Sequence, residues 1–308
     1  MNTTLLLIQL LNGLQYGILL FLIAAGLTLV FGVMGFINLA HGVQYMVGAY
    51  LTYLFYTITG NFFAALVLGL IAALIFGLVL EFVIFRHLYD RPHLDQVLAT
   101  FAIIIFLNEA VKAIFGPAPL TLPPPDILSA SFQLTDTLRY PVYRVAVMVV
   151  GLLVALGLYL VVTRTKVGML IRAGASNAPM VSALGVDIRR LFMFVFGFGA
   201  MLAGFAGAMT APIFAIEPGM GDSLLIVAFV VIIIGGVGSV RGAFIAALLV
   251  GLIDTLGRTM MVDGLRLALD PSAANQIGPA LSSMLIYVLM AAVLFFRPEG
   301  LFPAAGSR

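Results

Sequence analysis

Six long, predominantly apolar runs constrain this chain more than any other feature. A membrane-spanning helix needs about 20 mostly apolar residues, and each run is close to that length. Only 9% of the 308 residues are charged and 63% are hydrophobic, whereas soluble domains carry about 25% charged residues. The sequence therefore predicts an all-α, polytopic membrane protein. The runs are Leu5–Phe31, Phe62–Phe85, Val97–Phe115, Val142–Val162, Leu191–Ile216 and Ile277–Phe296.

Three further apolar segments are short or interrupted: Val43–Ile58, Leu224–Val237 and Ala243–Met261. With them we expect eight or nine membrane-crossing segments, some of them broken, in a single transmembrane domain over residues 1–308. The chain has 32 glycines, and glycine is frequent where transmembrane helices pack closely. Small residues recur at four-residue spacing around Ala73 and around Gly204, which predicts close helix packing at both places.

Basic residues indicate which loops face the cytoplasm, because cytoplasmic loops carry an excess of Lys and Arg. The segment Arg164–Arg190 holds five of the 15 basic residues. If this segment, residues 164–190, is cytoplasmic, the C-terminus from Arg297 onward is cytoplasmic too. The proline-rich loop Gly116–Tyr140 then lies outside. The N-terminus is outside with nine crossings and inside with eight. Because no basic residue precedes Arg86, a cleaved signal peptide is not expected.

The basic segment also carries the signals of a short helix. A capping side chain precedes it, a proline fits its first turn, and a glycine can end it. A capped helix in a cytoplasmic loop is a docking element for a partner, or it is only part of a positively charged loop. The residues that form the candidate helix are Ser176, Asn177, Pro179, Met180, Leu184 and Gly185.

Two glycine-rich breaks interrupt the apolar pattern, at Val30–Tyr50 and at Ile232–Ala247. Non-helical backbone at membrane depth is tolerated only where it is buried in protein or lines a cavity. Such breaks in corresponding places of two halves point to a transport core. The pattern is compatible with an internal repeat, although the residue identity between the two segments is slight. The candidate residues of a translocation path are Asn38, His41, Gly42, Gly235, Gly236, Gly238 and Ser239.

Polar residues inside the apolar segments have two interpretations. Asn38 and His41 can contact a substrate or a proton, or they can satisfy backbone groups that the break sets free, which is the more common role. The carboxylates of Glu81, Glu109 and Asp254 lie near span ends. There a salt bridge or an interfacial position is a better expectation than a proton relay.

Several functions lack support in the sequence. The two lysines, Lys112 and Lys166, do not belong to a phosphate-binding loop, so the chain is not expected to hydrolyse ATP. If it drives transport, the energy comes from a separate subunit or from an ion gradient. No catalytic arrangement stands out, and the chain is not expected to be an enzyme. It has no cysteine, and its three histidines are not spaced as a metal cluster. We therefore expect no cofactor and no metal. A net charge of +2 is too small to indicate nucleic acid.

Four segments, in this order, resemble the LivH-type permeases of branched-chain amino acid ABC importers. The resemblance covers nearly the whole chain. Two minor departures are Leu39, where phenylalanine is common in that family, and Val181, where alanine is usual. The segments are Gly26–Gly32 with Ile37–Gly42 and Gly48–Tyr50; Arg172 with Asn177 and Leu184–Val186; Gly235–Ala243; and Phe296–Phe302.

The resemblance implies a permease subunit in a bacterial cytoplasmic membrane. Its partners would be a second homologous permease subunit, two cytoplasmic ABC ATPase subunits and a substrate-binding protein outside the membrane. It would make Ser176–Gly185 the helix that couples the permease to the ATPase. The cargo would be a branched-chain or other hydrophobic amino acid, although the family includes permeases for urea and short amides.

Three alternatives remain open: an ion-coupled secondary transporter, a channel or structural subunit, and a sugar permease of the ribose type. The patterns at Asn38–Gly42 and Gly235–Ala243 favour the amino acid permeases over the sugar permeases.

Overall fold

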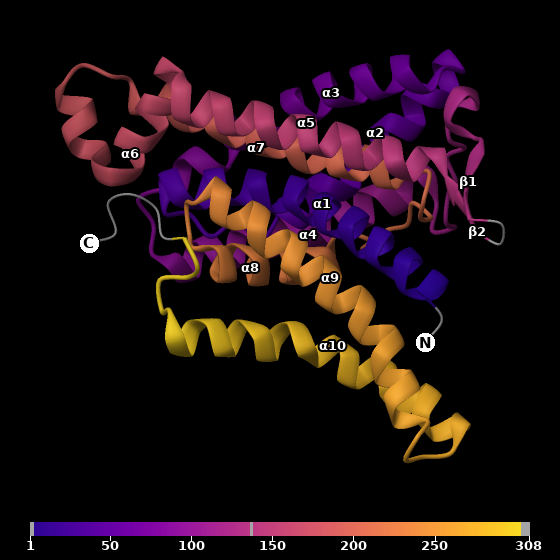
Figure 1. Cartoon of the computed structure of the whole chain (residues 1–308). Helices are drawn as coiled ribbons and strands as arrows, with labels where there is room; N and C mark the ends of the chain where they lie inside the picture. Colours follow the sequence, from indigo (N-terminus) through magenta and orange to yellow (C-terminus); the bar gives the residue numbers. More distant parts are fainter. Residues whose placement is uncertain (1–2, 136–137, 303–308) are drawn as a thin grey trace.

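The computed structural model describes residues 3–135 and 138–302. Over these ranges the chain is mostly helical, with one short β-hairpin (Figure 1). The α-helices are α1 (Thr3–Met34), α2 (His41–Thr59), α3 (Phe62–Val83), α4 (His93–Phe115), α5 (Val142–Arg164), α6 (Lys166–Ala183), α7 (Ile188–Thr210), α8 (Asp222–Gly235), α9 (Val240–Leu265) and α10 (Pro271–Phe296). Two 3₁₀ helices, η1 (Phe85–His87) and η2 (Asp126–Leu128), and the strands β1 (Ser131–Thr135) and β2 (Leu138–Pro141) complete the described elements.

Seven of the described helices are long and apolar enough to cross a membrane: α1, α3, α4, α5, α7, α9 and α10. The chain is thus a multi-pass membrane protein, as expected. The nine apolar segments of the sequence each form a helix, but the expected eight or nine crossings is slightly too high a number. The count of seven is by length and composition: α2 and α8 are not among the seven, and α8 has only 14 residues, fewer than the roughly 20 that a full span needs.

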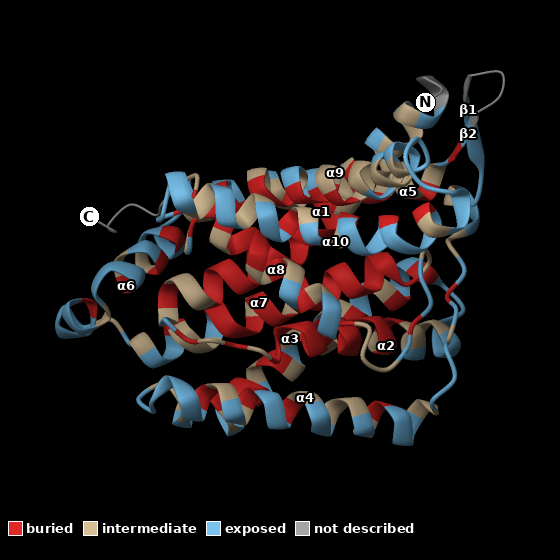
Figure 2. Cartoon of the chain, turned by 90° about the horizontal axis from the view of Figure 1, so that it is seen from below, coloured by how far each residue is buried: buried red, intermediate tan, exposed pale blue. Residues whose placement is uncertain are grey.

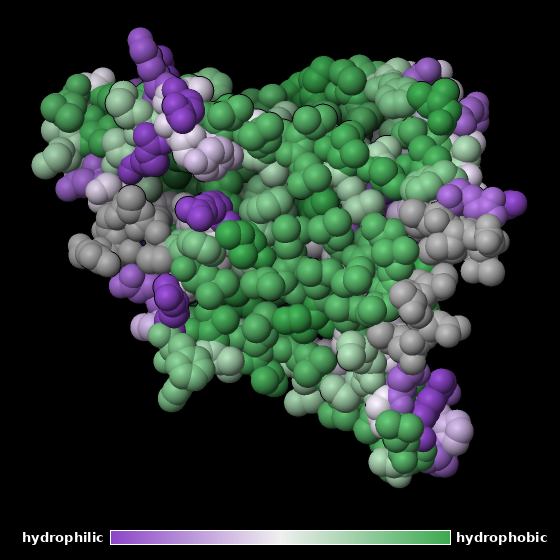
Figure 3. Space-filling model, viewed as in Figure 1, coloured by the Kyte–Doolittle hydropathy of each residue, from purple (hydrophilic) through white to green (hydrophobic). Residues whose placement is uncertain are grey.

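The interior of the bundle is built around α1 and α7. Figure 2 shows buried residues concentrated in α1, α7 and α8, whereas α4 and α10 are largely exposed. Exposed side chains such as Phe106 and Ile114 are apolar. Figure 3 shows a broad hydrophobic surface with hydrophilic residues gathered toward its ends. A bilayer can cover such a surface, because lipid tails are as apolar as these side chains.

Small residues bring the central helices close together. A Cβ on Gly48 of α2 would clash with the backbone of Gly204 of α7, and a Cβ on Gly204 would lie 2.7 Å from that of Ala73 in α3. In the same way Gly77 of α3 faces Ala200 of α7. The close packing predicted at Ala73 and Gly204 is therefore confirmed, and the two faces pack against each other.

The connection between α1 and α2 turns back into the bundle. After Met34 the chain reverses, and His41 Nε2 donates a hydrogen bond to the carbonyl oxygen of Ile23, at 3.0 Å. At a rise of 1.5 Å per residue, Ile23 lies about 16 Å before the end of α1. Helix α2 therefore starts near the middle of the bundle and runs to the end that carries β1 and β2, which we call the hairpin end.

The connection between α7 and α8 makes the same turn in the opposite direction. Helix α7 ends at the hairpin end, where Ile216 and Leu120 exchange backbone hydrogen bonds of 2.8 Å. Residues 217–221 then run inward, and α8 starts where the backbone of Gly221 touches that of Gly42. Helix α8 ends at the opposite end of the bundle, near α6, which we call the α6 end (Figure 1).

These two turns belong to an inverted repeat. The shift along the chain that carries Gly42 onto Gly221 also carries α1 onto α7, α2 onto α8, α3 onto α9 and α4 onto α10, within a few residues. Because α1 and α7 run in opposite directions, the two halves are inverted relative to each other. Helices α5 and α6 connect them. Inverted repeats of this kind form the core of many transporters.

The repeat corrects one sequence-based expectation. The counterpart of the first glycine-rich break is the segment 211–221, and not Ile232–Ala247. The second break is the turn between α8 and α9 at the α6 end. Glycine content suggested the wrong pairing, since the corresponding segments of the two halves share few residue types.

Candidate functional site

The expected short helix is the second part of α6. Asn177 has a non-helical conformation (φ −158°, ψ 85°) that breaks α6. Its Oδ1 accepts a hydrogen bond from the N–H of Met180, at 2.9 Å. Asn177 is therefore the cap, and Ser176 belongs to the preceding part of α6. Pro179 lies in the first turn, and Gly185 ends the helix with φ +89°, as the sequence predicts.

The short helix presents two apolar side chains to its surroundings. Met180 is 62% exposed and Leu184 is 79% exposed, whereas Val181 is buried and anchors the helix. Figure 1 shows α6 projecting beyond the ends of the neighbouring helices. An exposed apolar face at the end of a membrane bundle fits a protein partner better than water. Its role in coupling remains a prediction.

Two arginines around this helix, Arg172 and Arg190, have local partners. Arg172 donates a hydrogen bond to the backbone carbonyl of Val162. Arg190 forms an ion pair with Asp187, at 2.9 Å, and the Asp187 side chain caps α7 by accepting from the N–H of Arg190. The turn after the short helix is thereby joined directly to the start of α7.

Three of the predicted path residues lie in the centre of the bundle. Asn38 and His41 are fully buried, and Gly42 packs against the backbone of Gly221. Within the described residues, the side-chain atoms of Asn38 and the Nδ1 of His41 have no hydrogen-bond partner. These residues do not line either of the two cavities described below.

The other four predicted path residues lie at the α6 end. Helix α8 ends at Gly235, and Gly236 and Gly238 adopt positive φ values of 101° and 77°. Ser239 caps α9, because its Oγ accepts from the N–H of Gly242 at 3.1 Å. The predicted path therefore combines two structurally different turns, one before α2 and one between α8 and α9.

The chain after α10 covers this second turn. The N–H of Leu301 donates to the carbonyl of Ile234 at 2.8 Å, and the N–H of Phe302 donates to that of Gly235 at 3.0 Å. The Arg241 guanidinium lies 4.9 Å from the centre of the Phe302 ring. The motifs Gly235–Ala243 and Phe296–Phe302 are thus two sides of one contact, which their separation in the sequence concealed.

A cavity of about 290 Å³ opens in the half of the bundle near the hairpin end. Its walls come from α1, α2, the segment 211–221 and the start of α8, and its rim residues Phe214, Glu217 and Ser223 are exposed. We call it the outer cavity. Apolar walls with a few polar groups are typical of small-molecule sites. Its lining residues are Tyr16, Leu19, Leu20, Ile23, Tyr45, Thr210, Phe214, Ala215, Glu217, Gly219, Met220, Ser223 and Leu224.

A second cavity of about 200 Å³ lies near the α6 end, between α1, α5, α6 and the turn before α9. We call it the inner cavity. It contains two predicted path residues, Gly238 and Ser239, as well as Arg172 and Arg241. On α1, Ile23 lines the outer cavity and Thr28 the inner one, about 7.5 Å apart along the helix axis. Helix α1 therefore connects the two cavities.

Sequence reasoning missed the residues of the outer cavity. Tyr16, Tyr45 and Thr210 lie in apolar helices, where one hydroxyl group is no signal. Glu217 did carry a signal, since it follows the apolar run of α7 and precedes Pro218. That signal does not reveal a cavity, because the inward turn of residues 217–221 depends on packing with α2.

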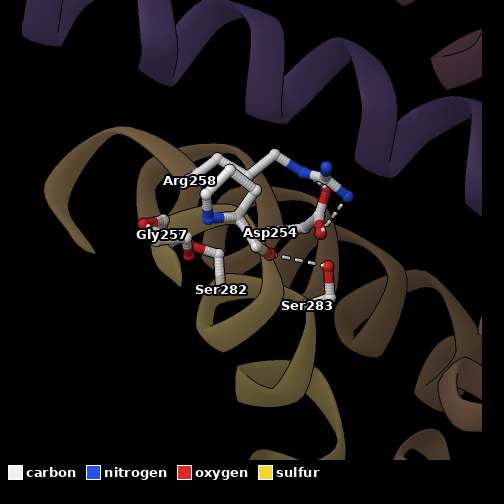
Figure 4. A network of polar contacts seen from close by, with 7 residues as sticks. Asp254, Gly257, Arg258, Ser282 and Ser283 are labelled. Carbon is white, nitrogen blue, oxygen red and sulfur yellow. Dashed lines mark hydrogen bonds and ion pairs between the residues drawn. The ribbon is translucent and has the colours of Figure 1, made fainter. Parts of the chain in front are cut away.

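The three carboxylates expected near span ends are paired, although Asp254 is the fifteenth of the 26 residues of α9 and so lies near the middle of that span. Asp254 accepts two hydrogen bonds of 3.0 Å from Arg258 (Figure 4). Nearby, Ser282 of α10 donates to the carbonyl of Gly257, at 2.9 Å, and holds α10 on α9. Glu109 pairs with Lys112 at 2.6 Å.

Glu81 is buried at the α6 end and also has partners. It accepts a hydrogen bond from the Tyr89 hydroxyl at 3.0 Å and lies 3.6 Å from Arg86. Burial, followed by the neighbouring carboxylate, raises the pKa of Tyr89, so the hydroxyl stays protonated and continues to donate. Among the described residues, His, Asp and Glu side chains form no group of three that could hold a metal ion.

Membrane-length helices, two inverted halves and cavities on either side of one central helix define a membrane transport protein. The chain belongs to the family described as the permease component of branched-chain amino acid transport systems, whose profile matches residues 9–294. This confirms the resemblance seen in the four sequence segments. The matched proteins are transport permeases and not enzymes, in agreement with the expectation for this chain.

Curated relatives extend over most of the chain. The high-affinity branched-chain amino acid transport system permease protein BraD of Pseudomonas aeruginosa is 30% identical over 311 residues, which cover 95% of this chain and 94% of the relative. The corresponding LivH protein of Escherichia coli is 28% identical and covers 80% of this chain and 84% of its own. LivM of Escherichia coli, also a permease protein of that system, is 28% identical over 92% of this chain and 67% of its own. No solved structure was found to match the chain.

Proposed function

We propose that this chain is the permease subunit of an ATP-binding-cassette importer that carries branched-chain or other hydrophobic amino acids across a bacterial cytoplasmic membrane. The observation that carries the proposal is the family match over residues 9–294, together with cavities at both ends of a buried central helix. BraD and LivH, which are permeases for branched-chain amino acids by name, support the substrate class.

The translocation path follows α1. A substrate enters the outer cavity, in which six of the 13 lining residues are leucine, isoleucine, phenylalanine or methionine, and leaves through the inner cavity. Apolar walls suit a branched aliphatic side chain, because its transfer from water gains about 25 cal/mol for each Å² buried. The layer between Ile23 and Thr28 separates the two cavities and has to open during transport. The path thus passes beside Asn38 and His41, and includes Gly238 and Ser239.

The free energy of ATP hydrolysis reaches this chain at the α6 end. The chain carries no phosphate-binding loop, so cytoplasmic ATPase subunits bind Met180 and Leu184 of the short helix. Asp187 then passes the movement to α7, since its side chain caps that helix. This assignment places the α6 end and the C-terminus in the cytoplasm. The start of α1 and the hairpin end then lie outside, where a substrate-binding protein docks. The second permease subunit is a LivM-like relative or a second copy of this chain.

Leu184→Asp tests the coupling role. It puts a charge on the exposed apolar face and leaves the buried Val181 in place. We expect the variant to lose co-purification with the ATPase and to lose amino acid uptake. Leu267→Asp is the matched control, because Leu267 is 91% exposed at the opposite end of the molecule. If Leu184→Asp retains both co-purification and uptake, the short helix is not the coupling element.

The alternatives predict other observations. An ion-coupled secondary transporter needs an unpaired carboxylate near mid-membrane, whereas the buried Glu81 and Asp254 are both paired with arginine. Uptake that stops with an ionophore while ATP remains would favour that alternative. Ion currents through this chain alone would favour a channel. Competition of labelled leucine uptake by urea, acetamide and valine distinguishes an amino acid permease from an amide permease.

A further inference from the structure

Three buried polar side chains around the start of α2 carry hydrogen-bonding atoms that have no partner in the described part of the fold. Asn38, His41 and Gln44 are each at most 2% exposed. Within the described residues, both polar atoms of Asn38 and of Gln44 and the Nδ1 of His41 have no hydrogen-bond partner. Gln44 lies beside the His41 imidazole without the geometry of a hydrogen bond. Buried polar groups are nearly always paired, so a cluster like this one calls for an explanation.

The inverted repeat supplies the explanation. The shift that carries Gly42 onto Gly221 carries Asn38, His41 and Gln44 onto three residues that line the outer cavity. One contact supports this correspondence: Gly42 and Gly221 are counterparts of each other, and their backbones touch. The corresponding residues of the outer cavity are Glu217, Met220 and Ser223.

The two sets of residues are therefore equivalent in position but opposite in exposure. Glu217 and Ser223 are exposed at the rim of an open cavity, whereas Asn38 and Gln44 are closed off. Segment 211–221 enters the bundle from the hairpin end, and residues 35–40 enter it from the α6 end. A cavity equivalent to the outer one would therefore open toward the α6 end.

We propose that Asn38, His41 and Gln44 line a third cavity, open to the cytoplasm, which forms when the outer cavity closes and which receives the charged end of the transported amino acid. The inference rests on the proposed transport function and adds a specific site to it. His41 keeps its structural hydrogen bond to Ile23 through Nε2. The amides of Asn38 and Gln44 each offer a donor and an acceptor, and can thus hydrogen-bond to both the carboxylate and the ammonium of a zwitterion.

The outer cavity and the proposed third cavity lie on either side of one contact, which stays in place while one cavity closes and the other opens. Gly42 and Gly221 touch at the centre of the repeat, where the starts of α2 and α8 meet. Tyr45 and Leu224, which also correspond to each other, both line the outer cavity. The same pair lies next to the proposed cavity as well, so a substrate could pass from one set of residues to the other without leaving this contact.

Thiol labelling tests the proposal directly, because the chain has no cysteine. Asn38→Cys, Gln44→Cys and Ser223→Cys are placed separately in the assembled importer, in membrane vesicles of either orientation, and labelled with a membrane-impermeant thiosulfonate with and without ATP. Ala228→Cys, at a fully buried apolar position of α8, sets the background. Leu94→Cys, at a position that is 68% exposed at the start of α4, marks the cytoplasmic side.

The nucleotide condition that slows labelling of Ser223→Cys from outside is expected to speed labelling of Asn38→Cys and Gln44→Cys from the cytoplasmic side. The change should be about tenfold or more, because a minor conformation is often populated at only about 0.1–10%. If both thiols stay at the background rate of Ala228→Cys in every condition, or react from outside, the proposal is overturned. Amino acid uptake by the same vesicles is measured separately, so that a failure of the transport function is distinguished from a failure of this site.

A second test does not need a thiol in the core. Asn38→Leu removes the polar atoms and should favour the closed state of these residues. We expect labelling of Ser223→Cys from outside to become several-fold faster and uptake to slow down. Thr52→Val is the control: Thr52 is also a buried polar residue of α2, but its hydroxyl bonds to Gly48 in its own helix. If Asn38→Leu leaves both labelling and uptake unchanged, the residue has no part in a second state.

Discussion

Gly42 and Gly221 lie back to back, and a Cβ on either would clash with the backbone of the other. This contact joins the starts of α2 and α8 and lies at the centre of the inverted repeat. Both helices begin there because the chain turns inward before each of them, once from the α6 end and once from the hairpin end.

Gly42→Ala should disrupt this contact. The new Cβ would meet the carbonyl of Gly221 and lie 2.9 Å from the Cβ of Leu225, and neither the backbone nor a Cβ can move aside easily. Overpacking of this kind costs about 1–3 kcal/mol. We expect a lower unfolding temperature in detergent and slower uptake.

Gly157→Ala is the matched control for that variant. Gly157 is also in a helix, α5, but a Cβ there would have no atom within 4 Å. The substitution should be neutral or stabilise the helix by up to about 1 kcal/mol. If both variants behave alike, the tight contact between α2 and α8 does not limit stability.

Local signals in the sequence predicted much of this fold, because they depend on neighbouring residues. The apolar runs located nine helices, and Asn177, Pro179 and Gly185 located the short helix of α6. The pairing of Glu109 with Lys112 followed from its place near a span end. In each case the physical cause acts within a few residues of the chain: burial in lipid, capping, or a partner one helical turn away.

The candidate site depends on contacts between distant residues, so the sequence could not reveal most of it. Asn38 corresponds to Glu217, and His41 to Met220, without any shared chemistry. The two halves share the order and packing of their helices, but few residues are identical between them. For the same reason the outer cavity was missed. Its walls meet only after residues 217–221 turn inward against α2.

The ion pair between Asp254 and Arg258 should stabilise the bundle, and breaking it should cost free energy. Arg258→Leu leaves the carboxylate of Asp254, which is 8% exposed, without its partner. Losing one partner of a fully buried pair costs about 3–5 kcal/mol. Arg258 is half-exposed, so we expect a smaller loss, about 1–3 kcal/mol. Thermal unfolding in detergent measures it.

The double variant separates charge from packing. Replacing Asp254 by Asn in the Arg258→Leu background removes the unpaired charge, and most of the lost stability should return, because apolar or neutral replacements of buried pairs are often tolerated. A double variant as unstable as Arg258→Leu alone would mean that the packing of the arginine, and not its charge, holds α9.

The contact between the C-terminal segment and the turn after α8 predicts a sensitive glycine. Gly300 has φ +85°, and a Cβ there would lie 2.6 Å from the Cα of Gly236. Gly300→Ala should therefore cost about 1–2 kcal/mol from the left-handed conformation alone. It should also weaken the hydrogen bonds of Leu301 and Phe302 to α8.

Limited proteolysis from the cytoplasmic side measures this effect, since a loosened C-terminal segment is cut sooner. Gly264→Ala is the control, because Gly264 has open space around it and lies at the other end of the molecule. Equal cleavage of the two variants would show that the contact with Gly236 does not hold the segment in place.

A bulky side chain at the rim of the outer cavity should block transport without disturbing the ATPase contact. Ser223 is exposed and lines the cavity near the start of α8, so Ser223→Trp would fill much of the 290 Å³ space. Uptake of labelled leucine should fall at least about tenfold, because the indole would occupy the space that the substrate has to enter. Co-purification with the ATPase should stay unchanged, because the short helix of α6 lies at the opposite end. Met284→Trp, at a position of α10 that is 58% exposed, should leave both unchanged. If Ser223→Trp transports leucine normally, the substrate does not pass through the outer cavity, and the path must run elsewhere in the bundle.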